Sequence, residues 1–312
     1  MSLRPRQRVG PYVVESQLGA GGMATVWRAR DERRGQPVAI KIMGDLLDDD
    51  DKLVARFIDE LRRHAQLQHP NIVAVRDVMS VGGKPCMVMD LIAGGSLANA
   101  LQKAPNGRLP CVQALPLIKD ILAALDYAHR KGLVHRDVKP SNILLDEQRR
   151  HAWLSDFGIA LAAGEKRRTR TGVSVGTNAY MSPEQIRAES IDFRSDVYSV
   201  GCVLYETLTG QPPFVSTAAS DDSARAAVLA AHLGDRPVPP RRREPSIPPH
   251  VNRLILQALE KDPARRVAGC AEFARLLDAS GKSEGRKARL LPAASIVIAA
   301  LVVLVLITLI AT

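Results

Sequence analysis

One polar run in the middle of the chain, with a tripeptide that follows it, constrains this sequence more than any other feature. The run HRDVKPSN covers His135 to Asn142, and DFG begins at Asp156 after a short apolar stretch that predicts two strands. These segments supply a carboxylate that can accept a proton, a cation and oxygen ligands for Mg²⁺. Transfer of a phosphoryl group from ATP needs this combination. We assign the base to Asp137, the cation to Lys139 and metal binding to Asn142 and Asp156.

The composition allows a large folded unit. The chain has 312 residues, of which 46% are hydrophobic, and this is enough for a two-lobed enzyme or two small domains. The net charge of +10 would permit nucleic-acid binding, but the basic residues are dispersed and lack interleaved aromatic residues. We therefore expect no nucleic-acid partner. The cysteines show no metal-binding spacing, which predicts reduced, mostly buried thiols: Cys86, Cys111, Cys202 and Cys270. The N-terminus lacks the apolar segment of a signal peptide.

Residues 12–40 predict strands around a glycine-rich turn. Gly19, Gly21 and Gly22 would let the backbone approach phosphate oxygens, because no side chain intervenes and positive φ is allowed. The turn departs from the GxGxxG pattern at Ala24, and Lys41 follows on the strand VAIK, where its ammonium would lie near the α- and β-phosphates. The residues expected to surround the nucleotide here are Leu18, Gly19, Ala20, Gly21, Gly22, Met23, Val26, Ala39 and Lys41.

The next segments predict a helix and the link between two lobes. Apolar residues recur every four positions over residues 51–69, which indicates a helix with one buried stripe. Glu60 on this helix is the expected ion-pair partner of Lys41, and the alternative is a solvated carboxylate. Residues 84–97 are an apolar strand that runs into a Gly-Gly turn. Met89 would border an adenine slot, with backbone groups of Asp90 and Ile92 facing the base, unless this is a plain strand-to-helix connection.

After a predicted buried helix over residues 111–131, the order and spacing of these motifs resemble protein kinases of the Ser/Thr type. The nearest group is the bacterial eukaryotic-like Ser/Thr kinases, many of which are membrane-anchored and carry extracellular PASTA repeats. The resemblance covers residues 12–277 and implies an α+β fold with a β-rich lobe (12–92) and a helical lobe (93–277). It also implies binding of ATP with Mg²⁺, or Mn²⁺ as the alternative metal, and Ser/Thr protein substrates.

The resemblance implies regulation by a segment that runs from Asp156 to Glu184 and ends in SPE, where APE is commoner. Thr177 resembles the threonine that contacts the catalytic Asp and Lys, and Arg136 the arginine that pairs with an activating phosphate. Thr169 and Thr171 match the paired autophosphorylated threonines of the bacterial group, which predicts phosphorylation in trans and a homodimer that carries it out. The alternative is that KRRTRT is only a solvated basic loop.

Other positions match structural residues of the family. Residues 192–214 predict a helix that is buried on all sides, and Asp196 would tie its start to the backbone of the polar run. Glu184 and Arg266 resemble a buried ion pair that closes the lower lobe. Residues 215–249 predict a mobile helix plus a loop that could dock a partner.

The C-terminal residues predict a membrane anchor. Residues 278–292 are a polar, basic linker, and residues 293–312 carry no charge. Twenty helical residues span about 30 Å, which matches the hydrocarbon thickness of a bilayer. The basic residues before the span place the kinase on the cytosolic side of the plasma membrane, and the alternative is a buried core helix. We expect no extracellular sensor after the span, unlike in the PASTA kinases.

We therefore expect an active Ser/Thr protein kinase, and the alternative is a pseudokinase scaffold at the membrane. The pseudokinase is disfavoured because Lys41, Asp137, Asn142 and Asp156 are all present. A small-molecule kinase is disfavoured by the complete segment up to SPE, which builds a groove for a polypeptide. His64 stands where kinases place an apolar residue, in a stack with Phe157 and His135. We expect a satisfied, partly buried histidine, and the alternative is that it lowers basal activity.

Overall fold

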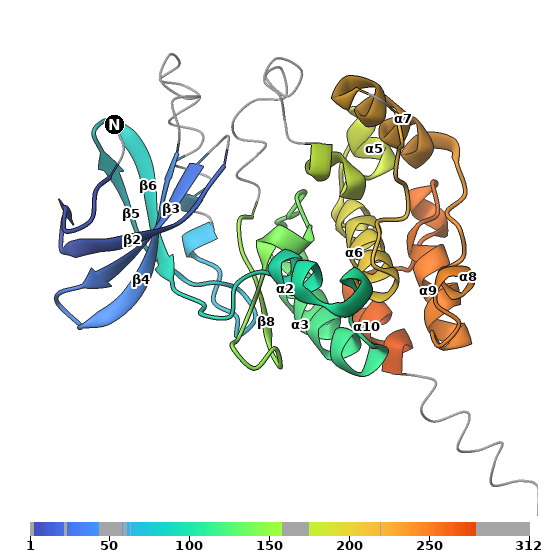
Figure 1. The fold of residues 1–312 in the computed structure, drawn as a ribbon, viewed down its shortest axis with the longest axis horizontal. Helices are drawn as coiled ribbons and strands as arrows, with labels where there is room; N and C mark the ends of the chain where they lie inside the picture. The colour runs from blue at the N-terminus through green and yellow to red at the C-terminus, as the bar shows by residue number, and fades with distance from the viewer. Residues whose placement is uncertain are drawn as a thin grey trace, which may run out of the picture.

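A six-stranded antiparallel sheet forms one end of the molecule (Figure 1). The computed structural model describes residues 3–21, 24–43, 58, 61–62, 64–157, 175–218 and 220–278, with only the backbone at 175–177. The strands are β1 (Arg8–Val9), β2 (Tyr12–Ala20), β3 (Ala24–Asp31), β4 (Gln36–Met43), β5 (Val75–Val81) and β6 (Lys84–Asp90). They lie in the order β1-β2-β3-β4-β6-β5, so that β4 has a neighbour on each side.

The alternation of side chains along β4 gives the sheet two different faces. Ile40 packs on one face in a cluster with Tyr12, Trp27 and Val88. Ala39 and its neighbours pack on the other face, which lies toward the helices. Lys41 shares this second face, because it is two residues from Ala39, and it lies opposite Val26 on β3 and Met87 on β6. The sheet therefore holds the lysine on a central, paired strand.

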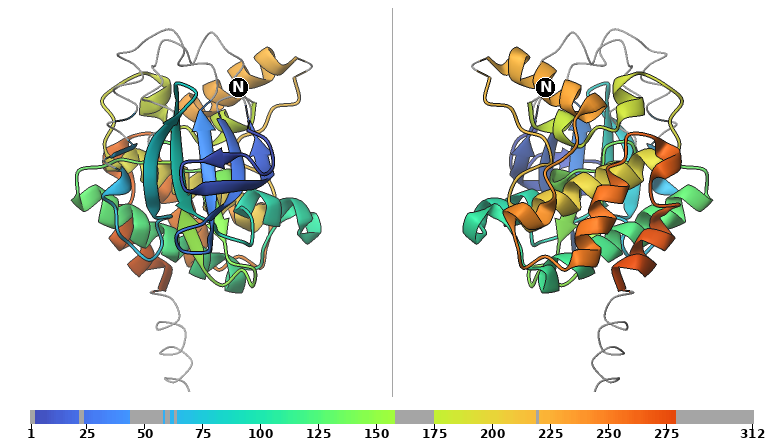
Figure 2. Two further views of the ribbon diagram at one scale, coloured as in Figure 1. Left: turned by 90° about the vertical axis from the view of Figure 1, so that its left-hand side faces the viewer. Right: turned by 90° about the vertical axis from the view of Figure 1, so that its right-hand side faces the viewer.

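Helices form the other end of the molecule, as the two side views show (Figure 2). They are α2 (Leu97–Lys103), α3 (Cys111–Arg130), α5 (Pro183–Ile186), α6 (Phe193–Thr209), α7 (Asp221–Gly234), α8 (Pro240–Arg243), α9 (Pro249–Ala258) and α10 (Cys270–Asp278), with 3₁₀ turns at Pro105–Gly107, Pro140–Asn142, Val175–Tyr180 and Pro263–Arg265. One buried cluster includes residues of α3, α6, α9 and α10. The expected two-lobed α+β architecture is confirmed.

A short hairpin carries the polar run and the DFG tripeptide at its two ends. Strand β7 (Ile143–Leu145) begins directly after Asn142, and β8 (Ala152–Leu154) ends two residues before Asp156. The two strands pair antiparallel, with Ile143 opposite Leu154. Both segments therefore emerge from the same end of the hairpin. Backbone hydrogen bonds between Asn71 and Leu154 (2.8 Å) and between Val73 and Leu154 (3.0 Å) attach this hairpin to the chain that enters β5.

Two predicted segments differ in the structure. Helix α6 ends at Thr209 instead of Phe214, because Gly210 adopts a left-handed φ of 83° that terminates the helix. Residues 215–249 were predicted to hold a mobile helix, but α7 is docked on the lobe. His232 of α7 is fully buried, and a hydrogen bond of 2.8 Å joins its Nδ1 to the Tyr198 hydroxyl.

The C-terminal segments fall outside this description. Within the described residues, no helix combines the length and the apolar content that crossing a bilayer requires. Residues 279–312, which include the predicted span at 293–312 and nearly all of the predicted linker, lie outside the described part of the chain.

Candidate active site

Lys41 and Asp156 meet between the two lobes. The Lys41 Nζ lies 2.7 Å from Asp156 Oδ1, although the residues are 115 positions apart. Burial alone would raise the pKa of Asp156, but the charge and hydrogen bond of Lys41 outweigh it and hold this pKa below its usual value. Asp156 is therefore ionised at neutral pH. Its φ of +64° is in the left-handed region, which a non-glycine residue keeps only when its surroundings fix it.

Two side chains of the polar run, those of Lys139 and Asn142, contact the carboxylate of Asp137. The Lys139 Nζ lies 2.9 Å from Asp137 Oδ2. The Asn142 amide nitrogen donates to the same oxygen at 3.1 Å and to the backbone carbonyl of Asp137 at 2.8 Å. The Asn142 Oδ1 accepts only a long hydrogen bond of 3.5 Å from the Ser141 hydroxyl, so that it retains a lone pair for another ligand. No described residue donates a hydrogen bond to Asp137 Oδ1, so that this oxygen can accept a proton.

A fully buried carboxylate fixes the backbone of the polar run through hydrogen bonds. Asp196, near the start of α6, accepts hydrogen bonds from the backbone N–H groups of His135 and Arg136, both at 2.8 Å. The His129 Nε2 also donates to Asp196, at 2.7 Å. Gln185 of α5 donates to the Arg136 carbonyl at 2.7 Å, where Arg136 has a positive φ of 66°. The structure thus places Asp196 where the sequence predicted it.

Direct contacts join the polar run to DFG. The His135 Nε2 donates to the Ser155 carbonyl at 2.9 Å, and its Nδ1 accepts the Asp137 N–H at 3.2 Å. The Ser155 N–H and hydroxyl both donate to the Asn142 carbonyl, at 2.9 and 3.0 Å. The positions of Asn142 and Asp156 are therefore coupled through the backbone.

The glycine-rich turn is described on both of its strands. Gly21 donates its N–H to the Ala24 carbonyl at 2.9 Å, which closes the hairpin. Neither Gly19 nor Gly21 has a positive φ, so the expected backbone freedom is not used at these two positions. A Cβ on Gly19 would meet nothing within 4 Å, and one on Gly21 would meet only the Ala24 carbonyl, at 3.9 Å. These glycines leave open space for a ligand.

Apolar residues from both lobes pack together where the adenine slot is predicted. Val26, Ala39, Met89, Ile92 and Leu144 belong to or pack against one cluster. The site residues predicted at Leu18 and Ala20 lie on β2, and the Leu18 side chain is half exposed. The Asp90 N–H donates to the Ala74 carbonyl at 3.0 Å, so that this N–H is not available to a base. The Asp90 carboxylate pairs with Arg76 at 2.5 Å.

Several predicted site residues lie outside the described part of the chain. These are Gly22, Met23, Glu60, Thr169 and Thr171, together with the side chain of Thr177. The predicted ion pair of Lys41 with Glu60 therefore remains a prediction, as does the role of the two threonines.

Three aromatic rings lie in a row behind Asp156. The Phe157 ring centroid is 4.6 Å from that of His135 and 5.0 Å from that of His64. His64 is 4% exposed, and neither of its ring nitrogens has a hydrogen-bond partner among the described residues. The expectation of a satisfied, partly buried histidine is therefore wrong. Burial lowers the pKa of His64 to about 4, which keeps the ring neutral at physiological pH.

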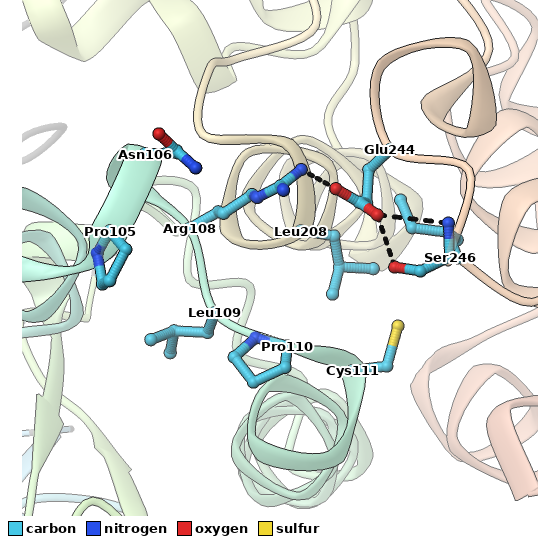
Figure 3. Close-up of a pocket in the computed structure, with 10 residues that line it drawn as sticks. Pro105, Asn106, Arg108, Leu109, Pro110, Cys111, Leu208, Glu244 and Ser246 are labelled. Carbon is cyan, nitrogen blue, oxygen red and sulfur yellow. Dashed lines mark hydrogen bonds and ion pairs between the residues drawn. The ribbon is translucent and has the colours of Figure 1, made fainter.

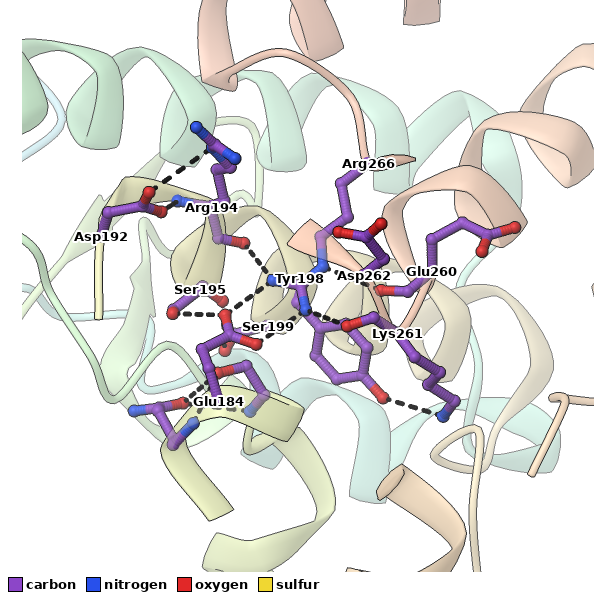
Figure 4. Close-up of polar contacts among 12 residues, drawn as sticks. Glu184, Asp192, Arg194, Ser195, Tyr198, Ser199, Glu260, Lys261, Asp262 and Arg266 are labelled. Atoms are coloured by element: carbon purple, nitrogen blue, oxygen red, sulfur yellow. Dashed lines mark hydrogen bonds and ion pairs between the residues drawn. The ribbon is translucent and has the colours of Figure 1, made fainter. Parts of the chain in front are cut away.

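A buried ion pair closes the helical lobe (Figure 4). The two Nη atoms of Arg266 each donate to one oxygen of Glu184, both at 2.7 Å, and Ser195 donates to the same carboxylate at 2.5 Å. Arg266 also donates to the carbonyls of Arg194 and Lys261, at 2.9 and 3.1 Å. Burial would raise the pKa of Glu184, but the Arg266 and Ser195 hydrogen bonds lower it to about 2. The predicted pair is in place with its donors satisfied.

An open hollow of about 530 Å³ lies beside the polar run. Lys139, Pro140 and Ser141 form one wall, and Tyr180 and Glu206 form another. The Tyr180 hydroxyl donates to Glu206 at 2.6 Å. Burial raises the pKa of Glu206 above its ordinary value. The hollow therefore borders the site on the side of Lys139.

A second hollow of about 260 Å³ lies between the start of α3, the end of α6 and the link from α8 to α9 (Figure 3). An ion pair between Arg108 and Glu244 crosses it, and Glu244 also accepts hydrogen bonds from Ser246. Burial raises the pKa of the Cys111 thiol, which makes the thiol a poor nucleophile at neutral pH. The predicted site residues do not line this hollow.

Sequence reasoning missed several partners of these residues. His129 contacts Asp196 across 67 positions, and its only local signal is its place in the last turn of α3. Gln185 follows directly after SPE, where the sequence offers a capping box with Ser182 and no sign of its contact with Arg136. The pair of Tyr180 and Glu206 has no signal in the sequence, because the two residues are 26 positions apart and belong to no shared motif.

Comparisons with known proteins agree with this geometry. The protein kinase domain family matches residues 12–276. The serine/threonine-protein kinase PknB of Mycobacterium leprae (strain TN) is 39% identical over 267 residues, which cover 84% of this chain and 42% of that protein. The serine/threonine-protein kinase PknJ of Mycobacterium tuberculosis (strain H37Rv) is 39% identical over 266 residues, covering 84% and 44%. The chain thus spans less than half the length of these curated relatives.

A solved structure shows the same fold. The crystal structure of the Mycobacterium tuberculosis PknI kinase domain superposes with a TM-score of 0.71 at 26% identity, and the match covers 88% of this chain and 98% of that one. The family match, the relatives and the fold agree, and the chain belongs to the protein kinase family.

Proposed function

We propose that this protein is an ATP-dependent Ser/Thr protein kinase that transfers the γ-phosphoryl group to hydroxyls of protein substrates. The observation that carries the proposal is the convergence of Lys41 with Asp156 and of Asp137 with Lys139 and Asn142 between the lobes. The similarity to PknB and PknJ, which are named as serine/threonine-protein kinases, supports the Ser/Thr class. A pseudokinase is not favoured, because Lys41, Asp137, Asn142 and Asp156 are all present in the site.

The donor atoms of the site suit Mg²⁺. Asp156 offers the carboxylate oxygen that Lys41 does not occupy, and Asn142 offers Oδ1 because its nitrogen is bonded to Asp137. Hard oxygen ligands of this kind, few in number, suit Mg²⁺ or Mn²⁺ bound together with nucleotide phosphates. When bound, the metal would neutralise charge on the β- and γ-phosphates. Lys41 would contact the α- and β-phosphates.

Asp137 would orient the attacking hydroxyl and accept its proton on Oδ1. Lys139 and Asn142 hold the other carboxylate oxygen, at 2.9 and 3.1 Å, which fixes the direction of Oδ1. Lys139 would also stabilise negative charge on the transferred group. Catalysis in this arrangement is mostly positioning and neutralisation of charge.

The hollow beside Lys139 suits a protein substrate. Its wall of Lys139, Pro140 and Ser141 belongs to the segment that carries Asp137, and its volume is about 530 Å³. A hydroxyl-bearing residue that enters along this wall would come close to Asp137. The second hollow is not lined by any residue of the polar run.

The remaining expectations extend this proposal. Autophosphorylation of Thr169 and Thr171 between two copies of the chain would order the segment before SPE through Arg136. An anchor at residues 293–312, with the basic linker 278–292 before it, would hold the kinase lobes (12–92 and 93–277) on the cytosolic face of the plasma membrane. The uncharged C-terminal stretch and the basic residues before it support this placement.

Incorporation of labelled phosphate tests the proposal. The purified full chain should transfer the γ-phosphate of ATP to a generic Ser/Thr-rich protein in the presence of Mg²⁺. The Asp137→Asn variant should lose about 10²- to 10⁴-fold in rate, the range for a positioned base. Asp222→Asn is the matched control, because Asp222 is an exposed carboxylate on α7. Equal rates for the wild type and Asp137→Asn would refute the proposal.

A further inference from the structure

His64 occupies a buried position behind the metal-binding segment. Its ring lies 5.0 Å from the ring of Phe157, the residue after Asp156. Leu61, one turn earlier, is also buried and packs in the cluster that contains Met87 on β6. His64 therefore packs directly against Phe157, the neighbour of Asp156, so that a change in the fit of His64 acts on Phe157 first.

The two histidines that flank Phe157 differ in how they are satisfied. His135 is fully buried, and both of its ring nitrogens are bonded, one to the Ser155 carbonyl at 2.9 Å and the other to the Asp137 N–H at 3.2 Å. His64 is nearly as buried, but both of its ring nitrogens lack partners among the described residues. A buried polar group without a partner is unfavourable, because it has lost its water and gained nothing in exchange.

The charged groups nearby do not relieve this deficit. Lys41 and Asp156 lie close enough to influence the charge of His64, but they are hydrogen-bonded to each other. His135 is engaged on both nitrogens. The ring of His64 would regain water if Phe157 moved away, so its unfavourable burial belongs to the arrangement in which Phe157 covers it.

We propose that His64 is a positioning residue that weakens the seating of Phe157 and so lowers the fraction of molecules in which Asp156 is held ready by Lys41. The inference rests on the kinase function proposed above and adds a limit on its basal activity. A residue that favours one arrangement over another shifts the populations by its differential free energy. An apolar side chain at position 64 removes the unpartnered nitrogens and should raise the competent fraction.

Two variants of similar size separate polarity from shape. Methionine and glutamine are both unbranched, but only glutamine brings buried polar atoms. We expect His64→Met to raise kcat by about 3- to 10-fold, and His64→Gln to stay within about twofold of the wild type or below it. The KM for the protein substrate should change by less than about twofold in both, because His64 does not contact the hollow. His64→Leu provides a second apolar variant if His64→Met does not fold.

Hydrogen–deuterium exchange provides a readout that does not depend on activity. The peptide containing Phe157 should exchange about 3- to 10-fold more slowly in the His64→Met full chain than in the wild type, and no more slowly in His64→Gln. His232→Met is the control, because His232 is also fully buried with one unpartnered nitrogen but lies on α7. It should change stability and leave exchange at Phe157 and kcat unaltered.

The possible results distinguish this inference from the kinase proposal. Equal kcat values and equal exchange at Phe157 in His64→Met and His64→Gln would overturn the role of His64. Absence of phosphate transfer in the wild type and in every variant would refute the kinase proposal, while the exchange rates would still decide whether His64 weakens the seating of Phe157.

Discussion

The buried charged groups of the helical lobe have more hydrogen-bond partners than those at the junction between the lobes. In the helical lobe, Glu184 and Arg266 satisfy each other with two short hydrogen bonds, and Asp196 accepts three. At the junction, one contact joins Lys41 to Asp156, and His64 is buried without partners. The difference indicates that the helical lobe is a fixed frame for the polar run, whereas the position of Asp156 relative to Lys41 can be adjusted.

The contribution of the Glu184–Arg266 ion pair to the stability of the helical lobe can be tested directly. Glu184→Gln should lower the free energy of unfolding by about 3–5 kcal/mol, because it leaves the buried Arg266 charge without its counterion. Urea denaturation measures this change. The exposed pair of Glu272 and Arg275 is the matched control, and Glu272→Gln should cost less than about 1 kcal/mol. The frame interpretation fails if both substitutions have the same small effect.

The junction should respond mainly in activity. Lys41→Met should reduce kcat/KM about 10²- to 10³-fold, the range for loss of one preorganised charge. It should lower the free energy of unfolding by less than Glu184→Gln does, because the Asp156 side chain that loses its counterion is 22% exposed. Steady-state kinetics with a protein substrate checks this expectation. Lys119→Met is the control, because Lys119 forms an exposed ion pair with Asp278 at 2.9 Å. A Lys41→Met enzyme that keeps most of its activity would exclude the assigned role.

Acidification should act on the buried histidines and on Glu184 in different pH windows. Burial lowers the pKa of His64 to about 4 and that of His232 to about 3, from an ordinary 6.5. Below pH 6.5 both histidines are protonated in the unfolded chain but stay neutral in the folded chain. Each histidine should therefore lower the free energy of unfolding by about 2 kcal/mol near pH 5. The stabilisation from Glu184, with a lowered pKa of about 2, is complete above pH 4.5 and is lost as the pH falls toward 2.

Urea unfolding at about pH 7.5, 5 and 3.5 would reveal these windows. Between about pH 7.5 and 5, the His64→Met variant should show a smaller decrease in stability than the wild type, because only His232 still contributes to it. The difference between the two proteins measures the contribution of the junction. A stability profile that stays flat down to about pH 5 would contradict the burial of both histidines.

The smallest effect is expected at the link between the lobes. Arg76 and Asp90 form an ion pair whose side chains are 44% and 35% exposed. Arg76→Gln should change the free energy of unfolding by no more than about 1 kcal/mol. Nucleotide affinity should also stay within about twofold, because a base would meet the Asp90 carbonyl and not its side chain. Calorimetric titration with an ATP analogue checks this, and a large loss of affinity would mean that the side chain takes part.

Local patterns in the sequence predicted the elements that carry the site. The helix predicted over residues 111–131 is α3 (Cys111–Arg130), and the apolar stretch between Asn142 and Asp156 forms β7 and β8 as expected. Spacing also identified Lys41 and Asp156, and the structure brings them into contact. These features were predictable because hydrophobic periodicity and motif spacing are properties of short segments.

Hydrogen bonds between polar groups that are distant in the sequence could not be predicted in the same way. The three backbone carbonyls that receive hydrogen bonds from Arg266 are set by how the chain turns around it, and no side chain marks them in the sequence. Docking of α7 through His232 depends on Tyr198, which is 34 positions away. The unpartnered nitrogens of His64 became evident only when every neighbour was in place.

Metal-dependent nucleotide binding tests the central claim most directly, which is that Lys41, Asp137, Asn142 and Asp156 form one site for ATP and Mg²⁺. Titration calorimetry with a non-hydrolysable ATP analogue should show affinity at least about tenfold higher with Mg²⁺ than without it. The Asp156→Asn variant should lose this gain. Binding that ignores the metal, or a metal effect that persists in Asp156→Asn, would contradict the account.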